Sequence, residues 1–265
     1  MFLSKTIKAT VRQILSQARM LWSGDFVLIY QMGKVGSTAL ERNLPNAMHF
    51  HTLYNNPHCP FRARLKWGWL GTNIILPIAY LLKRLSIRRN RRVRIITLVR
   101  HPIARARSVF FQELPYWLVL YANKRGLDER QEGDSVLRSA FTEVFNIEYY
   151  DRWFDHELKR FTGIDVFAQE FDAESGCVVL KKGRYEVLVV QYEKLAIAQP
   201  HIESFVGKQL DMTRENVSTN KWYGPIMQKF TEDDIADLPE CRRLLESRTS
   251  RYFGYTTDAE DSSGQ

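Results

Sequence analysis

The sequence has few of the features that stabilise or anchor a chain by means other than a hydrophobic core. Its 265 residues include only three cysteines, which lie far apart: Cys59, Cys177 and Cys241. An odd number of cysteines, without histidines at metal-ligand spacing, argues against a disulfide framework and a structural zinc site. We expect three ordinary thiols in a reducing compartment. Because no linker-like segment and no internal repeat divides the chain, we predict one domain over residues 1–255.

Long uninterrupted hydrophobic runs are also missing. Basic residues interrupt the N-terminal segment 1–22, which predicts an amphipathic helix and not a signal peptide. The most apolar later stretch, Trp67–Leu82, contains Pro77 and is shorter than the roughly 20 residues of a membrane-spanning helix. We therefore expect a cytoplasmic protein, whose basic charge is compatible with peripheral contact to a membrane surface. The acidic, polar residues 256–265 predict a disordered tail.

Positive charge is in excess and is concentrated in two segments. The formal net charge is +8, and basic residues gather in Phe61–Lys66 and Lys83–Arg94. Such clusters attract phosphates, sulfated sugars, nucleic acids or anionic membranes. A plain solvated surface explains Lys83–Arg94 equally well, so charge alone does not select a partner.

The order of the predicted elements indicates an α/β fold. Phe26–Tyr30 and Val93–Val99 are continuous runs of strand-forming residues, and Ala47–His51 is a further plausible strand. Pro102 suits the first turn of the helix that follows the third strand. Alternating strands and helices predict a mainly parallel central sheet flanked by helices in three layers, similar to the P-loop fold.

Two further patterns complete the predicted elements. Apolar and aromatic residues recur at helical spacing through Asp134–Arg160, which predicts helical core. Cys177–Leu180 and Glu186–Tyr192 are predicted to form a β-hairpin through Lys181–Arg184.

The turn after the first strand has the parts of an anion-binding loop. It comprises Gly33, Lys34, Val35, Gly36, Ser37 and Thr38, followed by a helix start that Pro45 interrupts. Glycines let the backbone turn around a phosphate, hydroxyls and amides donate hydrogen bonds, and Lys34 supplies positive charge. The loop does not fit the pattern G-x-x-x-x-G-K-[ST] of nucleoside triphosphatases, because the lysine precedes the second glycine.

Three motifs together resemble the sulfotransferases that use 3′-phosphoadenosine 5′-phosphosulfate. Lys34-Val35-Gly36-Ser37-Thr38 is similar to the loop that binds the 5′-phosphosulfate in that family. The segment Val99–Ser108 is similar to its 3′-phosphate motif, in which Arg100 and Ser108, eight residues later, bind the phosphate. Val187–Leu195 resembles a strand that ends in Tyr-Glu, where Tyr192 would contact the adenine.

The carbohydrate and capsular polysaccharide branch of the family is the closer resemblance. It rests on Tyr30–Ser37 and on the late segment Asn220-Lys221-Trp222-Tyr223. Cytosolic members of the family stack adenine on a tryptophan at the position of Ala39, so Trp222 or Tyr223 is the candidate here on chemical grounds. Lys221 is a candidate phosphate contact, although an ordinary surface loop explains it equally well.

The resemblance implies in-line transfer of a sulfonate to a hydroxyl, with Lys34 stabilising the leaving phosphate. The family uses a histidine or glutamate near the second strand as base, and His49 and His51 are the candidates. Both lie on one side of a strand, and an unperturbed histidine titrates near pH 6.5. We favour His51, which is nearer the strand end where ligands of parallel sheets bind.

Two other functions are weighed against this one. A P-loop-like kinase or nucleoside triphosphatase would need a different loop ending and an acidic Mg²⁺ ligand after a later strand. A non-enzymatic binder of nucleic acid or membrane would explain the charge but not the ordered motifs. We therefore expect the phosphosulfate nucleotide and a carbohydrate or other hydroxyl acceptor as partners, with no metal and no specific nucleic acid.

Overall fold

The computed structural model describes residues 26–44, 46–125, 133–211 and 221–255, together with Met20 and Gly24. Nearly all of the predicted N-terminal helix 1–22 and the whole predicted tail 256–265 lie outside the described residues. The three cysteines are free thiols and all are buried.

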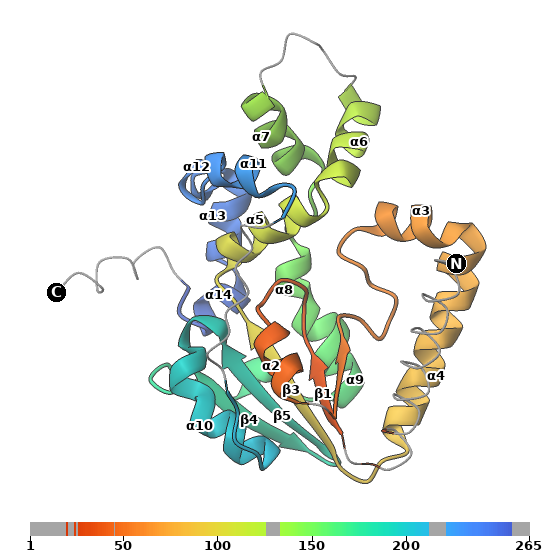
Figure 1. Cartoon of the computed structure of the whole chain (residues 1–265), viewed down its shortest axis with the longest axis vertical. Helices are drawn as coiled ribbons and strands as arrows, with labels where there is room; N and C mark the ends of the chain where they lie inside the picture. The colour runs from red at the N-terminus through yellow and green to blue at the C-terminus, as the bar shows by residue number, and fades with distance from the viewer. Residues whose placement is uncertain are drawn as a thin grey trace, which may run out of the picture.

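A five-stranded sheet forms the centre of the lower half of the molecule in Figure 1. The strand order is β2-β1-β3-β5-β4, in which neighbouring strands from β2 to β5 are parallel and β4 is antiparallel to β5. The predicted strands and hairpin are confirmed, and the apolar runs of β1, β3 and β5 are almost entirely buried, as expected for central strands of a parallel sheet. The strands are β1 (Val27–Tyr30), β2 (Ala47–Phe50), β3 (Val93–Val99), β4 (Cys177–Lys182) and β5 (Tyr185–Gln191).

Helices cover both faces of the sheet. In Figure 1, α2 (Thr38–Asn43) and α10 (Leu195–Val206) lie in front of the strands, and α8 (Tyr149–Trp153) and α9 (Arg160–Thr162) lie behind them. Leu40, Ile202 and Trp153 from these layers are buried in one core cluster with the strands. The predicted α/β class and mainly parallel sheet are confirmed, while the likeness to a P-loop fold stays a prediction.

The helical pattern predicted over Asp134–Arg160 is not one helix. It is divided into α7 (Gly133–Val144), α8, a π-helical segment η2 (Phe154–Lys159) and α9, with a break at residues 145–148. The break lies where the chain passes between two cores, since Phe141 is buried with the upper helices and Phe154 with the sheet. The apolar spacing continues across the break, so periodicity alone does not reveal it.

The second core is formed by helices and the short connections between them, and it lies above the sheet in Figure 1. Its centre is a group of aromatic side chains, in which the Phe110 ring contacts Phe141, Phe145 and Phe230 at 5.2–6.2 Å between ring centroids. The helices in this region are α5 (Pro102–Gln112), α6 (Leu114–Arg125), α7, α11 (Gly224–Lys229), α12 (Asp233–Ala236) and α13 (Pro239–Leu245), followed by α14 (Arg248–Tyr252).

One bent helical segment extends beside the sheet. It comprises α3 (Pro60–Leu70), a π-helical turn η1 (Gly71–Ile75) and α4 (Leu76–Arg88), and we call it the arm. The bend lies at Gly68, whose φ of 65° is left-handed. The sequence analysis treated Trp67–Leu82 as too short for a membrane-spanning helix, and this length was wrong. The stretch belongs to helices that continue over Pro60–Arg88, which are long and apolar enough by composition to cross a membrane.

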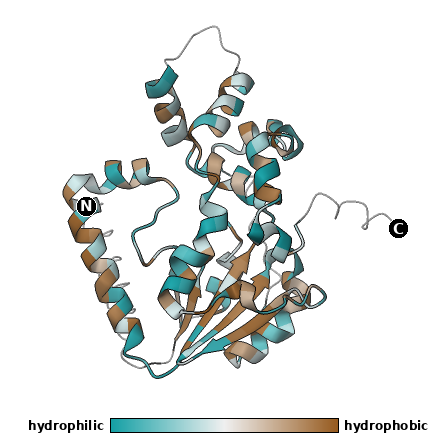
Figure 2. Cartoon of the chain, turned by 180° about the vertical axis from the view of Figure 1, so that it is seen from behind, coloured by the Kyte–Doolittle hydropathy of each residue, from teal (hydrophilic) through white to brown (hydrophobic). Residues whose placement is uncertain are grey.

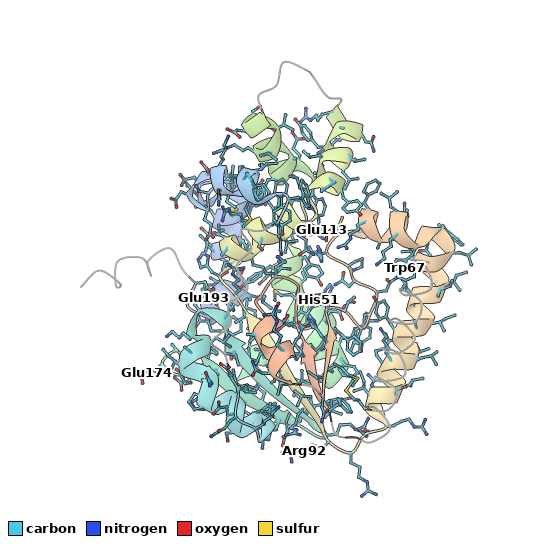
Figure 3. The ribbon with its side chains drawn as sticks, in the orientation of Figure 1. His51, Trp67, Arg92, Glu113, Glu174 and Glu193 are labelled. Atoms are coloured by element: carbon cyan, nitrogen blue, oxygen red, sulfur yellow. The ribbon has the colours of Figure 1, made fainter. Side chains whose placement is uncertain are left out.

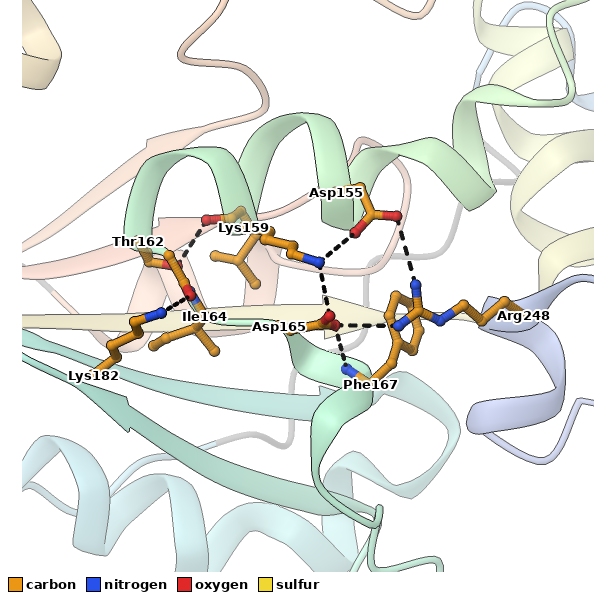
Figure 4. A network of polar contacts seen from close by, with 10 residues as sticks. Asp155, Lys159, Thr162, Ile164, Asp165, Phe167, Lys182 and Arg248 are labelled. Atoms are coloured by element: carbon orange, nitrogen blue, oxygen red, sulfur yellow. Dashed lines mark hydrogen bonds and ion pairs between the residues drawn. The ribbon is translucent and has the colours of Figure 1, made fainter.

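Short connections and polar contacts complete the fold. The 3₁₀ turns η3 (Val166–Ala168) and η4 (Tyr192–Lys194) follow α9 and β5. Asp165 accepts hydrogen bonds from Lys159 at 2.8 Å and Arg248 at 3.3 Å, and so connects η3 to the start of α14 (Figure 4). These ion pairs are exposed to solvent, so each contributes little to stability.

Candidate functional site

The sheet has a topological switch point between β1 and β3. The chain passes from β1 to β2 on one side of the sheet, whereas after β3 it passes to β4 and β5 on the other side. In parallel sheets, ligands bind outside the carboxyl ends of the strands at such a point. The loop that contains Lys34 follows β1, and Arg100 follows β3 directly. The topology therefore places these two motifs at the expected position for a ligand, independently of any family resemblance.

The loop after β1 is closely packed against Tyr192. Gly36 has a φ of 88°, and a Cβ added to it would lie 2.1 Å from a ring carbon of Tyr192. No side chain fits at this position, so glycine is required both by conformation and by the approach of the ring. Lys34 is also left-handed, with a φ of 70°. The tight turn thus brings the loop backbone against the first residue after β5.

Arg100 completes the meeting of the three predicted motifs. Its guanidinium carbon lies 5.2 Å from the centroid of the Tyr192 ring, and its Nη1 donates a long hydrogen bond of 3.5 Å to the Lys34 carbonyl oxygen. Residues 36, 100 and 192 are far apart in sequence and adjacent in space. The three motifs therefore meet at one edge of the sheet.

Lys34, Arg100 and Lys221 form a cluster of positive charge. The pKa of Lys34 is lowered to about 8, first by burial and then by the nearby Lys221, with Arg100 contributing less. Lys221 is therefore a neighbour of Lys34, although it comes from a segment far along the chain. Cations held this close repel one another, and an anion bound between them would relieve the repulsion. We call these three residues the cation cluster.

Arg105 is a buried cation beneath the same loop, and sequence reasoning assigned it no role. Its Nε donates to the Gly33 carbonyl oxygen at 3.0 Å, and its guanidinium lies over the rings of Tyr149 and Tyr150. Burial lowers its pKa to about 10, with partial compensation from both tyrosines. Its Nη2 has no hydrogen-bond partner within the described ranges. The only sequence signal was its place within the Val99–Ser108 motif.

The other residues predicted to contact the nucleotide lie in the loop after β1, at the start of α2 and on α5. Val35 is fully buried in the sheet core, so its side chain is structural, and the Ser37 hydroxyl donates to Glu41 at 2.5 Å. Thr38 begins α2 beside it. Ser108 is buried on α5, and among the described residues no hydrogen bond connects it to Arg100.

The two aromatic candidates for adenine stacking, Trp222 and Tyr223, differ in their exposure to solvent. Trp222 is 64% exposed, whereas Tyr223 is buried and stacks on Phe111 with a centroid distance of 6.3 Å. Tyr223 is therefore a core residue, and its candidacy was wrong. Trp222 remains accessible for stacking, and Lys221 next to it belongs to the cation cluster.

His51 is oriented as a neutral base at the edge of the loop. Its Nδ1 lies 3.1 Å from the Gln31 carbonyl oxygen, which can only accept, so the proton is on Nδ1 and Nε2 has a free lone pair. Nε2 lies 4.0 Å from the position of a Cβ added to Gly33. Burial, followed by the nearby His49, lowers the pKa of His51 to about 4, well below the value of 6.5 expected from sequence.

His49 has a different partner. Its Nδ1 lies 2.9 Å from a carboxylate oxygen of Glu41 on α2, while its ring packs edge-on against His51 at 4.4 Å. This contact with His49 lowers the pKa of Glu41 to about 2, although burial of the carboxylate acts in the opposite direction. His49 therefore positions α2 and supports the ring of His51, and the structure favours His51 as the residue facing the loop.

A buried carboxylate, Glu113, lies close to the same loop and was not found from sequence. It pairs with Arg62 on the arm, and its Oε1 lies 3.4 Å from His58 Nε2. Figure 3 shows Glu113 and His51 in the space between the sheet and the upper helices. Its Oε2 has no hydrogen-bond partner in the part of the chain that the structure describes. No local motif marks this residue, because α5 and the arm meet only in the folded chain.

Comparison with known proteins adds one finding. Residues 135–247 match the family model NKWYS, described as "Putative capsular polysaccharide synthesis protein". The matched segment runs from α7 to Ser247 and includes Tyr192, Lys221 and Trp222, but not Lys34 or Arg100. No curated protein and no solved structure matches the chain. The match supports the capsular polysaccharide part of the sequence-based prediction and does not bear on sulfonate transfer.

Proposed function

We propose that the protein is a sulfotransferase that transfers a sulfonate group from 3′-phosphoadenosine 5′-phosphosulfate to a hydroxyl group of a carbohydrate. The observation that carries the proposal is the cation cluster at the switch point of the sheet, where three segments distant in sequence bring Lys34, Arg100 and Lys221 together. The capsular polysaccharide family match supports a carbohydrate as the acceptor.

The residues at the site fit a nucleotide with negative charge at two positions. Lys34 and the loop around Gly36 would hold the 5′-phosphosulfate, Arg100 would hold the 3′-phosphate, and Lys221 would neutralise further charge. Tyr192 and Trp222 supply aromatic surface on which adenine can stack. The pKa of Lys34 is lowered first by burial and then by the neighbouring cations. A bound polyanion would relieve the repulsion between these cations.

The reaction balances without a metal or a redox partner. The acceptor oxygen forms a bond to sulfur, the bond from sulfur to the bridging phosphate oxygen breaks, and the acceptor proton leaves. His51 Nε2 would receive that proton, and its Nδ1–H bond to Gln31 would hold the ring in the required tautomer. Lys34 would stabilise the negative charge that grows on the leaving phosphate.

A kinase or nucleoside triphosphatase remains the alternative, because a triphosphate would also suit a cation cluster. Thermal unfolding with 3′-phosphoadenosine 5′-phosphate, AMP, ATP and GTP separates the two, since a ligand that binds only the folded state raises its stability. We expect the largest rise in melting temperature with 3′-phosphoadenosine 5′-phosphate. A larger rise with ATP or GTP would contradict the proposal and favour the alternative.

Arg100→Ala should weaken 3′-phosphoadenosine 5′-phosphate far more than adenosine 5′-phosphosulfate, which lacks the 3′-phosphate. A charge-assisted hydrogen bond contributes about 1.5–3 kcal/mol, or roughly tenfold to a hundredfold in affinity. Titration calorimetry with both nucleotides measures the difference. The matched control is Lys221→Ala, which removes a charge from the same cluster and should weaken both nucleotides. Equal losses for the two nucleotides in Arg100→Ala would remove Arg100 from the 3′-phosphate site.

Nucleotide affinity should depend on pH through Lys34. Because the pKa of Lys34 in the free protein is about 8, this side chain loses its charge above that pH. Binding of 3′-phosphoadenosine 5′-phosphate should therefore weaken from about pH 8 upward and be accompanied by proton uptake. In Lys221→Ala, the loss of the neighbouring charge should move the decline to higher pH. Affinity that stays constant from neutral pH to well above 8 would show that Lys34 does not contact the ligand.

A further inference from the structure

The arm has an apolar stripe that no part of the described structure covers. Six aliphatic residues are 43–61% exposed and recur at helical spacing. They lie along one side of the helical segment that runs from the last residue of α3 through η1 and α4. They are Leu70, Ile74, Ile78, Leu81, Leu82 and Leu85. Figure 2 shows the hydrophobic colour repeated along this helix, at the edge of the molecule. A contiguous stripe of this kind is typical of an interaction surface.

The arm and the four residues that follow it have charge of only one sign. Residues 60–92 contain nine lysines and arginines and no aspartate or glutamate. Lys66 is exposed near one end of the stripe, and Arg89 and Arg91 are exposed beyond the other. Trp67 and Trp69 add exposed indole rings, at 50% and 65% exposure, and Figure 3 shows Trp67 near the bend of the arm. Basic residues, tryptophans and an aliphatic stripe together suit the boundary between lipid headgroups and acyl chains.

Contacts at several points along its length hold the arm against the rest of the protein. Arg62 pairs with the buried Glu113, Asn55 donates to the Thr72 carbonyl oxygen at 2.9 Å, and Arg84 donates to the Leu53 carbonyl oxygen. Both ends are therefore fixed to the same folded body. A helix fixed in this way cannot cross a bilayer while these contacts persist, but it can lie in the plane of the surface.

We propose that the arm docks the protein peripherally on a membrane that contains anionic lipids. The stripe would enter the interfacial region, and the flanking cations would pair with the headgroups. Charge complementarity selects this partner. A second copy of the chain would bring two arms of the same charge together, and segment 1–19 has basic but no acidic residues. Nucleic acid would leave the aliphatic stripe in water. Docking is independent of the chemistry at the cation cluster.

Vesicle co-sedimentation of the full chain tests this surface. Wild type should bind phosphatidylcholine vesicles that contain about one third phosphatidylglycerol, bind less to phosphatidylcholine alone, and dissociate as salt is raised. Ile78→Asp with Leu82→Asp should reduce binding roughly tenfold or more, because two anchoring side chains are lost. The matched control is Val179→Asp with Ile197→Asp, at apolar residues that are 41% and 59% exposed outside the arm.

A second pair of variants tests the charges. Lys66→Glu with Arg89→Glu should reduce binding to anionic vesicles by roughly twenty-five-fold or more, because each removed cation contributes about fivefold and each new carboxylate repels the headgroups. Lys229→Glu with Arg251→Glu, exposed residues away from the arm, should retain binding. Thermal unfolding checks that each variant is folded. The proposal is overturned if wild type does not bind anionic vesicles, if the arm variants bind as well as their controls, or if the stripe variants instead dissociate a dimer.

Discussion

His51→Ala should retain nucleotide binding and lose roughly a hundredfold to ten-thousandfold in turnover, as is usual when a general base is removed. The expectation rests on the tautomer of His51. Because Nδ1 donates its proton to the Gln31 carbonyl oxygen, Nε2 has a lone pair that can accept a proton. The measurement is the rate of sulfonate transfer from 3′-phosphoadenosine 5′-phosphosulfate to a glycan acceptor, with nucleotide affinity determined separately.

His49→Ala is the matched control, because it removes the adjacent ring on the same strand. It should have a smaller effect, since His49 contacts Glu41 and supports the site indirectly. If His49→Ala lost activity while His51→Ala retained it, the base would be His49. If both variants stayed active, Glu113 would be the next candidate, because its buried carboxylate has an unpartnered oxygen near the loop. Glu113→Gln would then test it.

The pH dependence of the reaction gives a second measure of His51. Its lowered pKa of about 4 means that it is neutral, and able to accept a proton, throughout the neutral range. The kcat/KM profile, which reports the free enzyme, should therefore decline only as pH falls toward 4 and not near 6.5. This decline should be absent from the residual activity of His51→Ala.

Lys34→Met should lower turnover by roughly a hundredfold or more, with a smaller loss of nucleotide affinity. The reason is that the charge of Lys34 would matter most while the leaving phosphate becomes negative, an interaction stronger in the transition state than in the ground state. Single-turnover kinetics with bound nucleotide measure this effect apart from binding. Turnover equal to wild type would remove Lys34 from the mechanism.

The same substitution should stabilise the ligand-free protein. The folded-state pKa of Lys34, about 8, lies below its ordinary value of 10.5, so the unfolded chain binds more protons between these values. Wild-type stability should therefore rise with pH across this window, and the Lys34→Met variant should lack that rise. At neutral pH the variant should melt at a higher temperature than wild type, whereas a lower melting temperature would show that Lys34 has a structural role.

Most of the sheet could be predicted from sequence, because its strands are short, densely apolar runs that end in polar motifs. Val93–Val99 is an example, with the same bounds in the prediction and in the structure. The meeting of Lys34, Arg100 and Tyr192 could also be predicted, since residues that follow parallel strands share one edge of a sheet.

The remaining parts of the site depend on contacts between distant segments. Glu113 and Arg62 are ordinary charged residues until the arm meets α5, and Arg105 looks like any helical arginine until it is buried under Gly33. The pKa of His51 follows from burial and from neighbouring histidines, which spacing along a strand does not give. The exposure of the arm was likewise hidden, because apolar periodicity predicts burial in a soluble protein.

Calorimetric titration of the wild-type protein with 3′-phosphoadenosine 5′-phosphate and with ADP tests the central claim most directly. Both ligands are adenosine with two phosphates, and they differ in whether the second phosphate is on the 3′-hydroxyl or on the 5′-phosphate. If the cation cluster is built for a nucleotide charged at both positions, 3′-phosphoadenosine 5′-phosphate should bind at least roughly tenfold more tightly. ADP binding equally well or more tightly would contradict the assignment of the site to a sulfotransferase.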